Sequence, residues 1–261
     1  MPWDIHKTAV DRGMKVLTGK VPAFHVWMEF FGAGARDPAT GKFRHPNSPL
    51  LDVRVRKALN KAIDREAINK SFLGNEAEVM LLNHMHPTRE GWDPSWQRRW
   101  KDEYGYDPAA AKALLSAAGH GPNNPLTTTV IRSYQTGFPE GPDAQETIIA
   151  YWKAVGVEAK LETVDRATER RVAESFGYDN HFWMGTTFSA TGLDGYRIRQ
   201  INDPETLASN PNFKGNFRGI NLPELEDAII RTISARNAEE FASLSKPEST
   251  EGDRSGKRQG H

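Results

Sequence analysis

Residues 125–164 restrict the possible folds most, because two β-type runs flank a helical run there with short connections. The run "PLTTTVI" at 125–131 is rich in β-branched residues, which favour extended backbone. The segment 143–155 then repeats apolar residues at the spacing of one helix face, and Gly156 predicts its end. Apolar and charged residues alternate over 157–163, as in a half-buried strand. Strand, helix and strand in this order predict a right-handed parallel crossover and an α/β fold.

Capping residues mark where several helices begin. Aspartate, whose carboxylate accepts hydrogen bonds from the free N–H groups of a first turn, stands at four predicted starts: Asp52, Asp64, Asp107 and Asp143. Glu146 follows the last of them by three residues, which predicts a capping box. Gly74 and Gly119 stand where left-handed helix ends are expected. The first of these helices carries an apolar stripe over 55–63, and its basic residues face water.

The rest of the chain predicts two more strands, a loop and shorter helices. From Phe24 to Phe30 apolar residues alternate with others, which indicates a strand with one buried face. A further apolar run at 178–185 also predicts a strand. The residues 32–49 are rich in Gly and Pro and predict a long loop. Helices are further expected after Pro94, at 166–176, at 222–234 and at 237–244.

Composition removes several classes of function. Lys and Arg number 34 and so do Asp and Glu, so no net charge draws the molecule to nucleic acid. There are no cysteines, which excludes disulfides, thiolate catalysis and Cys-type zinc sites. No run approaches the roughly 18 apolar residues of a membrane span, so no membrane insertion is expected. The polar residues 245–261 predict a disordered tail.

Catalytic and metal-binding patterns are weak in this sequence. His84 and His86 form the one close histidine pair, and a metal-dependent hydrolase that uses them is an alternative hypothesis. A serine hydrolase would need a G-x-S-x-G elbow, which is missing. Acidic pairs are explained by helix starts. We therefore expect no enzyme, no catalytic residue, no metal and no cofactor.

Two sequence blocks resemble a known family. The segment "DVRVRKALNKAIDR" at 52–65 precedes "YDPAAAKALLSAAG" at 106–119, and a strand beginning Gly156-Val157 follows. This order is similar to the family 5 solute-binding proteins of bacterial ABC importers, over roughly residues 20–235. The resemblance implies a periplasmic-binding-protein-like (type II) lobe, with a mixed, partly parallel sheet flanked by helices, and an incomplete chain.

The resemblance also implies a domain division and a cellular role. Residues 1–31 would be a hinge-approach segment from a missing first lobe, 32–244 the second lobe, and 245–261 the tail. The protein would be periplasmic, or extracellular and membrane-associated, and would capture a small solute such as a peptide for ABC transporter permease subunits. A micromolar ligand has a binding free energy of about 8 kcal/mol. A lone lobe that keeps half of its contacts would bind it at about millimolar affinity at best. A truncated product without function is a further hypothesis.

A cluster of aromatic, hydroxyl and glycine residues over 182–196 predicts the ligand site, because open α/β sheets bind ligands where strands end. With the hinge strand, the expected ligand-binding residues are Trp27, Phe182, Trp183, Met184, Thr186, Thr187 and Phe188. In the peptide receptors of the resembling family, a Trp and an Asp stand where this chain has Gly185 and Phe188, whereas Asp179 aligns. The ligand class therefore stays open among peptide, sugar, opine and metal complex.

Overall fold

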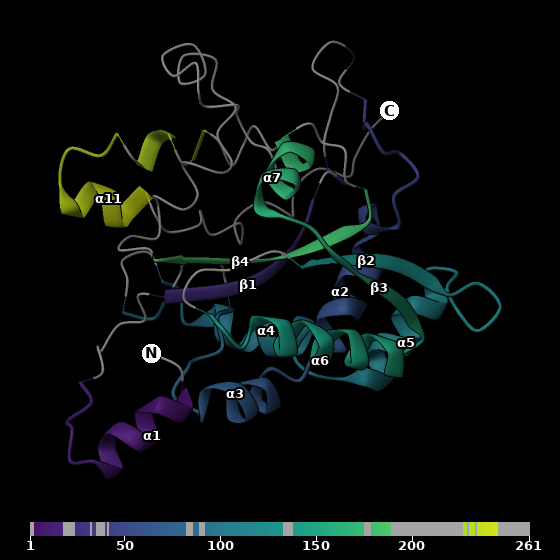
Figure 1. Cartoon of the computed structure of the whole chain (residues 1–261). Coiled ribbons are helices and arrows are strands. Elements are labelled where there is room, and N and C mark those ends of the chain that lie inside the picture. Colours follow the sequence, from purple (N-terminus) through teal and green to yellow (C-terminus); the bar gives the residue numbers. More distant parts are fainter. Residues whose placement is uncertain are drawn as a thin grey trace.

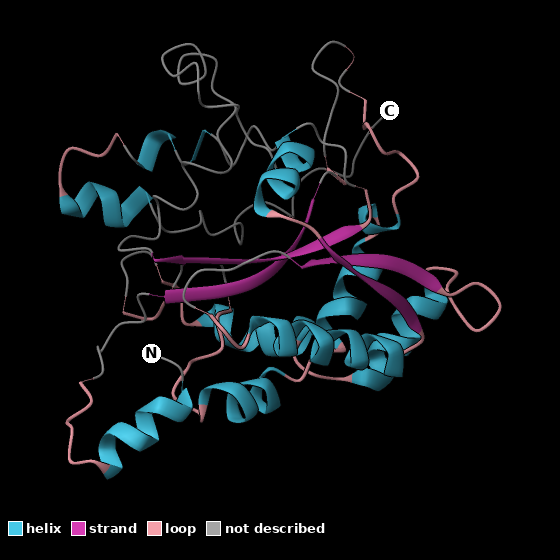
Figure 2. Cartoon of the chain, in the orientation of Figure 1, coloured by secondary structure: helices cyan, strands magenta, loops and turns pink. Residues whose placement is uncertain are grey.

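A four-stranded mixed sheet with helices on both sides forms the frame of the protein (Figures 1 and 2). This computed structural model describes residues 3–17, 24–31, 33–34, 40, 42–81, 86–88, 92–132, 138–174, 179–188, 227–228, 230–232 and 234–244. The strands lie in the order β1, β4, β2, β3. The chain therefore enters the sheet at one edge, forms the opposite half, and returns to the middle.

The strands are β1 (Phe24–Phe31), β2 (Leu126–Arg132), β3 (Val157–Thr163) and β4 (His181–Phe188). β2 runs parallel to both β3 and β4, while β1 pairs antiparallel with β4. The predicted strand–helix–strand unit is thus confirmed as β2, α6 and β3, and the sheet is mixed and partly parallel as expected.

The helices form two groups on opposite sides of the sheet (Figure 1). They are α1 (Trp3–Asp11), the 3₁₀ turn η1 (Pro49–Leu51), α2 (Val53–Lys61), α3 (Arg65–Leu73), α4 (Ser95–Tyr104), α5 (Pro108–Ala117), α6 (Gly141–Ala154), α7 (Arg166–Glu174) and α11 (Ala238–Leu244). Helices α2 to α6 lie against one face, and α7 and α11 lie on the other.

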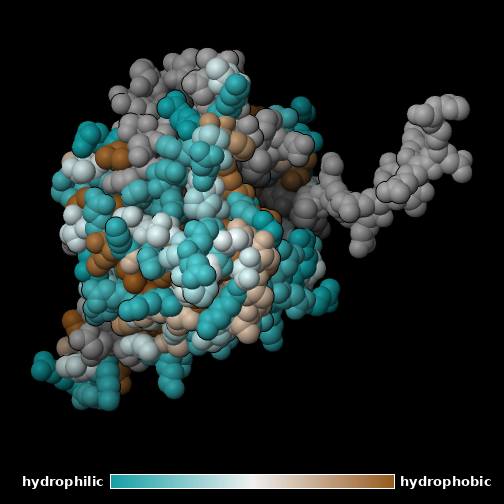
Figure 3. Space-filling model, turned by 90° about the vertical axis from the view of Figure 1, so that its right-hand side faces the viewer, coloured by the Kyte–Doolittle hydropathy of each residue, from teal (hydrophilic) through white to brown (hydrophobic). Residues whose placement is uncertain are grey.

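Within the described ranges, no helix is long and apolar enough to span a membrane. Hydrophilic residues prevail on the face shown in Figure 3.

Three of the four predicted aspartate caps are confirmed. Asp52, Asp64 and Asp107 each accept a backbone N–H bond in the first turn of α2, α3 and α5. The predicted capping box at Asp143 is wrong, because α6 begins earlier, at Gly141, and Asp143 lies inside the first turn. Proline at the second position of α6 has its backbone angle preset for a helix, which favours this earlier start.

Alternation along the strands divides their side chains between two faces. The face toward α2–α6 holds the main core, which includes Leu126 and Val130 of β2, Val157 of β3, and Phe182 and Met184 of β4. Trp152 of α6 lies at its centre with 1% of its surface exposed, and its ring centroid is 4.8 Å from that of Phe182. The core therefore joins the crossover helix directly to the middle strand.

The carboxyl end of α2 is the junction of the helical layer. The carbonyl groups at a helix end have no partner within the helix. Here Leu59 O accepts the indole N–H of Trp152 at 3.0 Å, and Lys61 O accepts the backbone N–H of Asp107 at 2.8 Å. Helices α5 and α6 are thus fixed to the same turn of α2.

Arg65, the first residue of α3, completes this junction. Its guanidinium donates to the carbonyl oxygen of Asn60 at 3.1 Å and to Asn60 Oδ1 at 2.8 Å. It also lies 5.3 Å over the ring of Trp100 on α4. Burial lowers the pKa of Arg65 to about 10, so the group stays protonated at neutral pH. A cation at the negative end of α2 is electrostatically favourable there.

Several predictions fall partly outside the described residues. The helix predicted at 222–234 is helical at residues 227, 228 and 230–232, and Ser234 lies in a turn. The next predicted helix is confirmed as α11. The predicted tail, 245–261, lies outside the described ranges. The division at residue 31 stays a prediction, although β1 is hydrogen-bonded into the same sheet as β4. Helix α1 was not predicted.

Replacing Trp152 by Phe tests the α2 junction. The change keeps an aromatic ring but leaves Leu59 O buried without its donor, which costs about 1–3 kcal/mol. Urea unfolding followed by circular dichroism measures the loss. Trp96→Phe, at a half-buried position on α4, is the matched control and is expected to cost less. Equal stability of Trp152→Phe and the wild type would contradict the role assigned to this bond.

Asp52 gives a pH-dependent test of the cap on α2. Hydrogen bonds from Arg54, first from its side chain and then from its backbone, lower the pKa of Asp52 below its ordinary value. A carboxylate with a lowered folded-state pKa contributes stability above its unfolded pKa, and this contribution disappears as the pH falls through the folded value. Asp52→Ala is expected to lose about 1 kcal/mol near pH 7.

The melting temperatures of wild type and Asp52→Ala, measured between pH 7 and pH 2, should converge toward the acid end. Asp102→Asn removes an exposed carboxylate of α4 and is expected to leave this profile unchanged. A difference between wild type and Asp52→Ala that persists undiminished at the lowest pH would refute the carboxylate's role.

Candidate functional site

The carboxyl end of β2 is the structural candidate for a ligand site. Ile131 is paired with Trp183, so Arg132, the last residue of β2, lies level with Met184. β4 continues from Gly185 to Phe188 beyond this point, paired only with β1 among the described strands. Ligands of open α/β sheets bind at such carboxyl ends, where neighbouring strands stop and leave a crevice.

Trp27 of β1 lies directly opposite Gly185 of β4 at this point. A Cβ atom built on Gly185 would be 2.6 Å from Cε2 of the Trp27 indole and 2.8 Å from its Nε1. The ring therefore occupies the space of a side chain at 185. A large side chain at 185 and the indole of Trp27 therefore do not fit there together. Trp27 itself is half-buried.

Trp183 lies on the same face of the sheet as Trp27, opposite the main core. It is 5% exposed and packs with Ile131 of β2 in a small second cluster. The guanidinium of Arg166 lies 5.1 Å from its ring and is paired with Glu169 at 3.0 Å. Trp183 therefore holds α7 against the sheet, and its burial leaves little of the indole for a ligand.

Phe182 and Met184 lie on the other face. Phe182 packs against Trp152 and, edge-on at 6.0 Å, against Phe30 of β1. Met184 is buried in the same core, beside Phe138 and Gly141. Adjacent residues of a strand point to opposite faces, so a single exposed surface cannot include both these residues and Trp183. In this structure Phe182 and Met184 are core residues.

The remaining predicted residues follow along β4. Thr186 is half-buried and is paired with Val26. The backbones of Thr187 and Phe188 are paired with His25 and Phe24, and their side chains lie outside the described parts. At the end of the sheet, Trp27 therefore lies on one face and Thr186, beside Val26, on the other.

Sequence reasoning missed two polar residues that fix the end of β2. Arg132 donates to the carbonyl oxygen of Pro142 at 3.1 Å and pairs with Glu146 at 2.8 Å. Gln145, which is buried, donates to the carbonyl oxygen of Ile131 at 3.0 Å. These three interactions tie the strand end to the first turns of α6. A polar residue in the apolar pattern of α6 was the available signal for Gln145.

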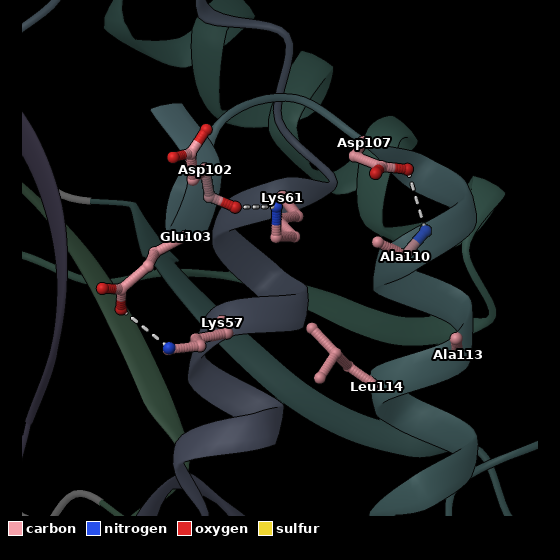
Figure 4. Close-up of a pocket in the computed structure, with 8 residues that line it drawn as sticks. All are labelled: Lys57, Lys61, Asp102, Glu103, Asp107, Ala110, Ala113 and Leu114. Carbon is pink, nitrogen blue, oxygen red and sulfur yellow. Dashed lines mark hydrogen bonds and ion pairs between the residues drawn. The ribbon is translucent and has the colours of Figure 1, made fainter. Parts of the chain in front are cut away.

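A groove of about 590 Å³ lies between α2, α5 and the end of α4 (Figure 4). Lys57 pairs with Glu103 at 2.8 Å, and Lys61 donates to the carbonyl oxygen of Asp102 at 2.9 Å. The hydrogen bond between Lys57 and Glu103 raises the pKa of Lys57 and lowers the pKa of Glu103. Both ammonium groups are already engaged within the lining, so this groove is a charge-paired helix junction rather than a site prepared for an anion.

The histidine hypothesis finds no support in the described residues. Nδ1 of His86 lies 2.6 Å from Oγ1 of Thr88, and Nε2 lies 2.8 Å from Oε2 of Glu78. His84 lies outside the described ranges. Where the structure is described, no three His, Asp or Glu side chains are grouped as metal ligands.

Comparison with curated proteins finds several binding proteins. The chain is 27% identical over 209 residues to the periplasmic murein peptide-binding protein MppA of Escherichia coli (strain K12), with 76% of this chain and 35% of MppA covered. It is 29% identical over 210 residues to heme-binding protein A of Haemophilus influenzae, with 78% and 35% covered. The chain thus spans about a third of the length of these relatives.

Solved structures show the same fold. HbpA2 from Haemophilus parasuis matches with a TM-score of 0.63 at 20% identity, over 93% of this chain and 43% of that one. The oligopeptide-binding protein AppA from Bacillus subtilis, in complex with a nonapeptide, matches with a TM-score of 0.61 at 18% identity, over 94% and 45%. The predicted type II periplasmic-binding-protein-like fold is therefore confirmed. Residues 21–196 match the family model "Bacterial extracellular solute-binding proteins, family 5 Middle", so the chain belongs to this family.

Proposed function

We propose that this chain is a substrate-binding component of an ABC transporter and captures a small solute at the carboxyl end of β2. The observation that carries the proposal is the half-buried indole of Trp27, laid over Gly185 where β2 stops and β4 continues. Family membership supports the solute-binding role. The role calls for a surface that holds a ligand without altering it, and no catalytic side chain takes part in it.

A short peptide is the proposed ligand class. The names of relatives point this way, since they include a murein peptide-binding protein and dipeptide-binding proteins. The site offers the aromatic side chain of Trp27, which suits an apolar part of a peptide. Thr186 is paired with Val26 and therefore lies on the other face of the sheet from Trp27. Heme is the second candidate, because heme-binding protein A is about as similar to this chain as MppA is.

Location and partners follow from the same proposal. One relative, MppA, is named as periplasmic, so we place this chain in the periplasm or outside the cell, at the membrane. Its partners would be the permease subunits of the transporter, to which a loaded binding protein delivers its ligand.

We further propose that this chain supplies one of two surfaces that enclose the ligand. Its match to about a third of its relatives' length supports this division. A micromolar ligand has a binding free energy of about 8 kcal/mol, and half of that corresponds to about millimolar affinity. Weak binding by this chain alone is therefore part of the proposal.

Titration of the ¹⁵N-labelled chain with the tripeptide Ala-Ala-Ala tests both parts of the proposal. Backbone resonances of residues 24–27 and 185–188 are expected to shift, with a Kd of about 1 mM. Shifts confined to the groove of Lys57 and Lys61 would contradict the placement of the site. Micromolar affinity would contradict the division between two surfaces, and the absence of any saturable shift up to about 10 mM would contradict peptide binding. The same titration with heme tests the second candidate.

A further inference from the structure

The strand β3 forms one edge of the sheet. It comes last in the strand order and, among the described strands, pairs only with β2. The backbone N–H of Val164, just after β3, donates to the carbonyl oxygen of Arg132 on β2 at 3.0 Å. Backbone groups alternate between the two edges of a strand, so the even-numbered residues of β3 also turn theirs toward β2. The odd-numbered residues turn their N–H and C=O groups outward, away from the sheet.

The second half of β3 is also open on both of its faces. The side chains of residues 160–163 are all exposed, whereas Val157 at the start of the strand is buried. Leu161 is 37% exposed, although it is paired with the fully buried Val130. An exposed apolar residue on an unpaired strand edge favours pairing with a further strand.

The charges of β3 select how two copies of this edge can pair. Glu158, Lys160 and Glu162 alternate in sign along one face of the strand. An antiparallel pair centred on Lys160 would place Lys160 opposite Lys160 and Glu158 opposite Glu162, which is repulsive. An antiparallel pair centred on Leu161 places Lys160 of each copy opposite Glu162 of the other. Within the described ranges, neither Lys160 nor Glu162 has another ion-pair partner.

A pair centred on Ala159 would also match opposite charges, Lys160 with Glu158, but it is shorter. It ends at Gly156, whose φ of +92° departs from the extended backbone. The pair centred on Leu161 extends to Val164, which still bonds to β2. The longer ladder, with the exposed leucines in contact at its centre, is therefore the favoured arrangement.

We propose that two copies of this chain associate through β3, antiparallel about a two-fold axis at Leu161. The outward backbone groups of Ala159, Leu161 and Thr163 bond to those of the second copy, and the two sheets become one. Leu161 packs on Leu161 of the second copy, and Lys160 pairs with Glu162 on both sides of the axis. β1 forms the opposite edge of the sheet, so the proposed ligand site near Trp27 lies outside this contact. A contact of one strand pair is small, and its expected Kd is about 100 µM.

Sedimentation equilibrium of the full chain, from about 10 µM to about 1 mM, measures the association. Lys160→Glu and Glu162→Lys each place like charges opposite one another on both sides of the axis. Each variant alone is expected to raise the Kd about tenfold or more. One variant carries Glu at both positions and the other carries Lys at both. An equimolar mixture of the two is therefore expected to form a heterodimer with about the wild-type affinity.

Glu158→Lys is the matched control, because position 158 lies opposite Val164 in this register, and it is expected to keep the wild-type Kd. Ala159→Pro tests the backbone pairing, because it removes an outward N–H and leaves the bonds to β2 intact. It is expected to weaken association about as much as the charge variants, with circular dichroism as the check of its fold. If Ala159→Pro does not fold, the mixture of charge variants decides.

Three results would overturn the inference. The first is a wild type that stays monomeric up to about 1 mM. The second is a mixture of Lys160→Glu and Glu162→Lys that associates no more tightly than either variant alone. The third is a loss of affinity in Glu158→Lys equal to that in Glu162→Lys, which would exclude the axis at Leu161. None of these results bears on the peptide titration, so the proposed function stands or falls separately.

Discussion

The carbonyl groups at the end of α2 are the constraint on which the helical layer depends. Trp152 reaches Leu59 from α6, Arg65 reaches Asn60 from α3, and the Asp107 backbone reaches Lys61 from α5. No glycine ends this helix; groups of three other helices donate to its last carbonyl oxygens, and the backbone N–H of Ile63 also donates to Asn60. A buried carbonyl without a donor is costly, so these bonds fix the relative positions of the helices more strictly than apolar contact alone.

Because side chains alternate along a strand, aromatic residues of the sheet pack on its two opposite faces. Phe182 points toward Trp152 and anchors the helical layer, while Trp183 points the other way and anchors α7. Trp27, at the level where β2 has ended, completes neither cluster and instead lies across Gly185. The same sheet therefore supports packing where its strands are all present and a proposed binding surface where one of them stops.

The local elements were largely predictable, because their signals are local. Asp52, Asp64 and Asp107 cap helices as expected, and β2, α6 and β3 follow from periodicity. The distribution of aromatic side chains between the two faces of the sheet depends on contacts distant in sequence. Alternation along β4 indicates that Phe182 and Trp183 face opposite ways, but it does not say which face the helices cover. The pairing of Trp27 with Gly185 likewise had no signal in either segment alone.

The place of β1 in the sheet has a consequence for the order of folding. β1 is near the amino terminus, yet its partner in the described sheet is β4, the last strand of that sheet along the chain. Contacts between such distant segments require closure of a long loop and slow folding. Synthesis proceeds from the amino terminus, so β1 cannot pair until β4 has left the ribosome. β2 and β3 can pair around α6 before that. The surface around Trp27 would accordingly be among the last parts of the molecule to take shape.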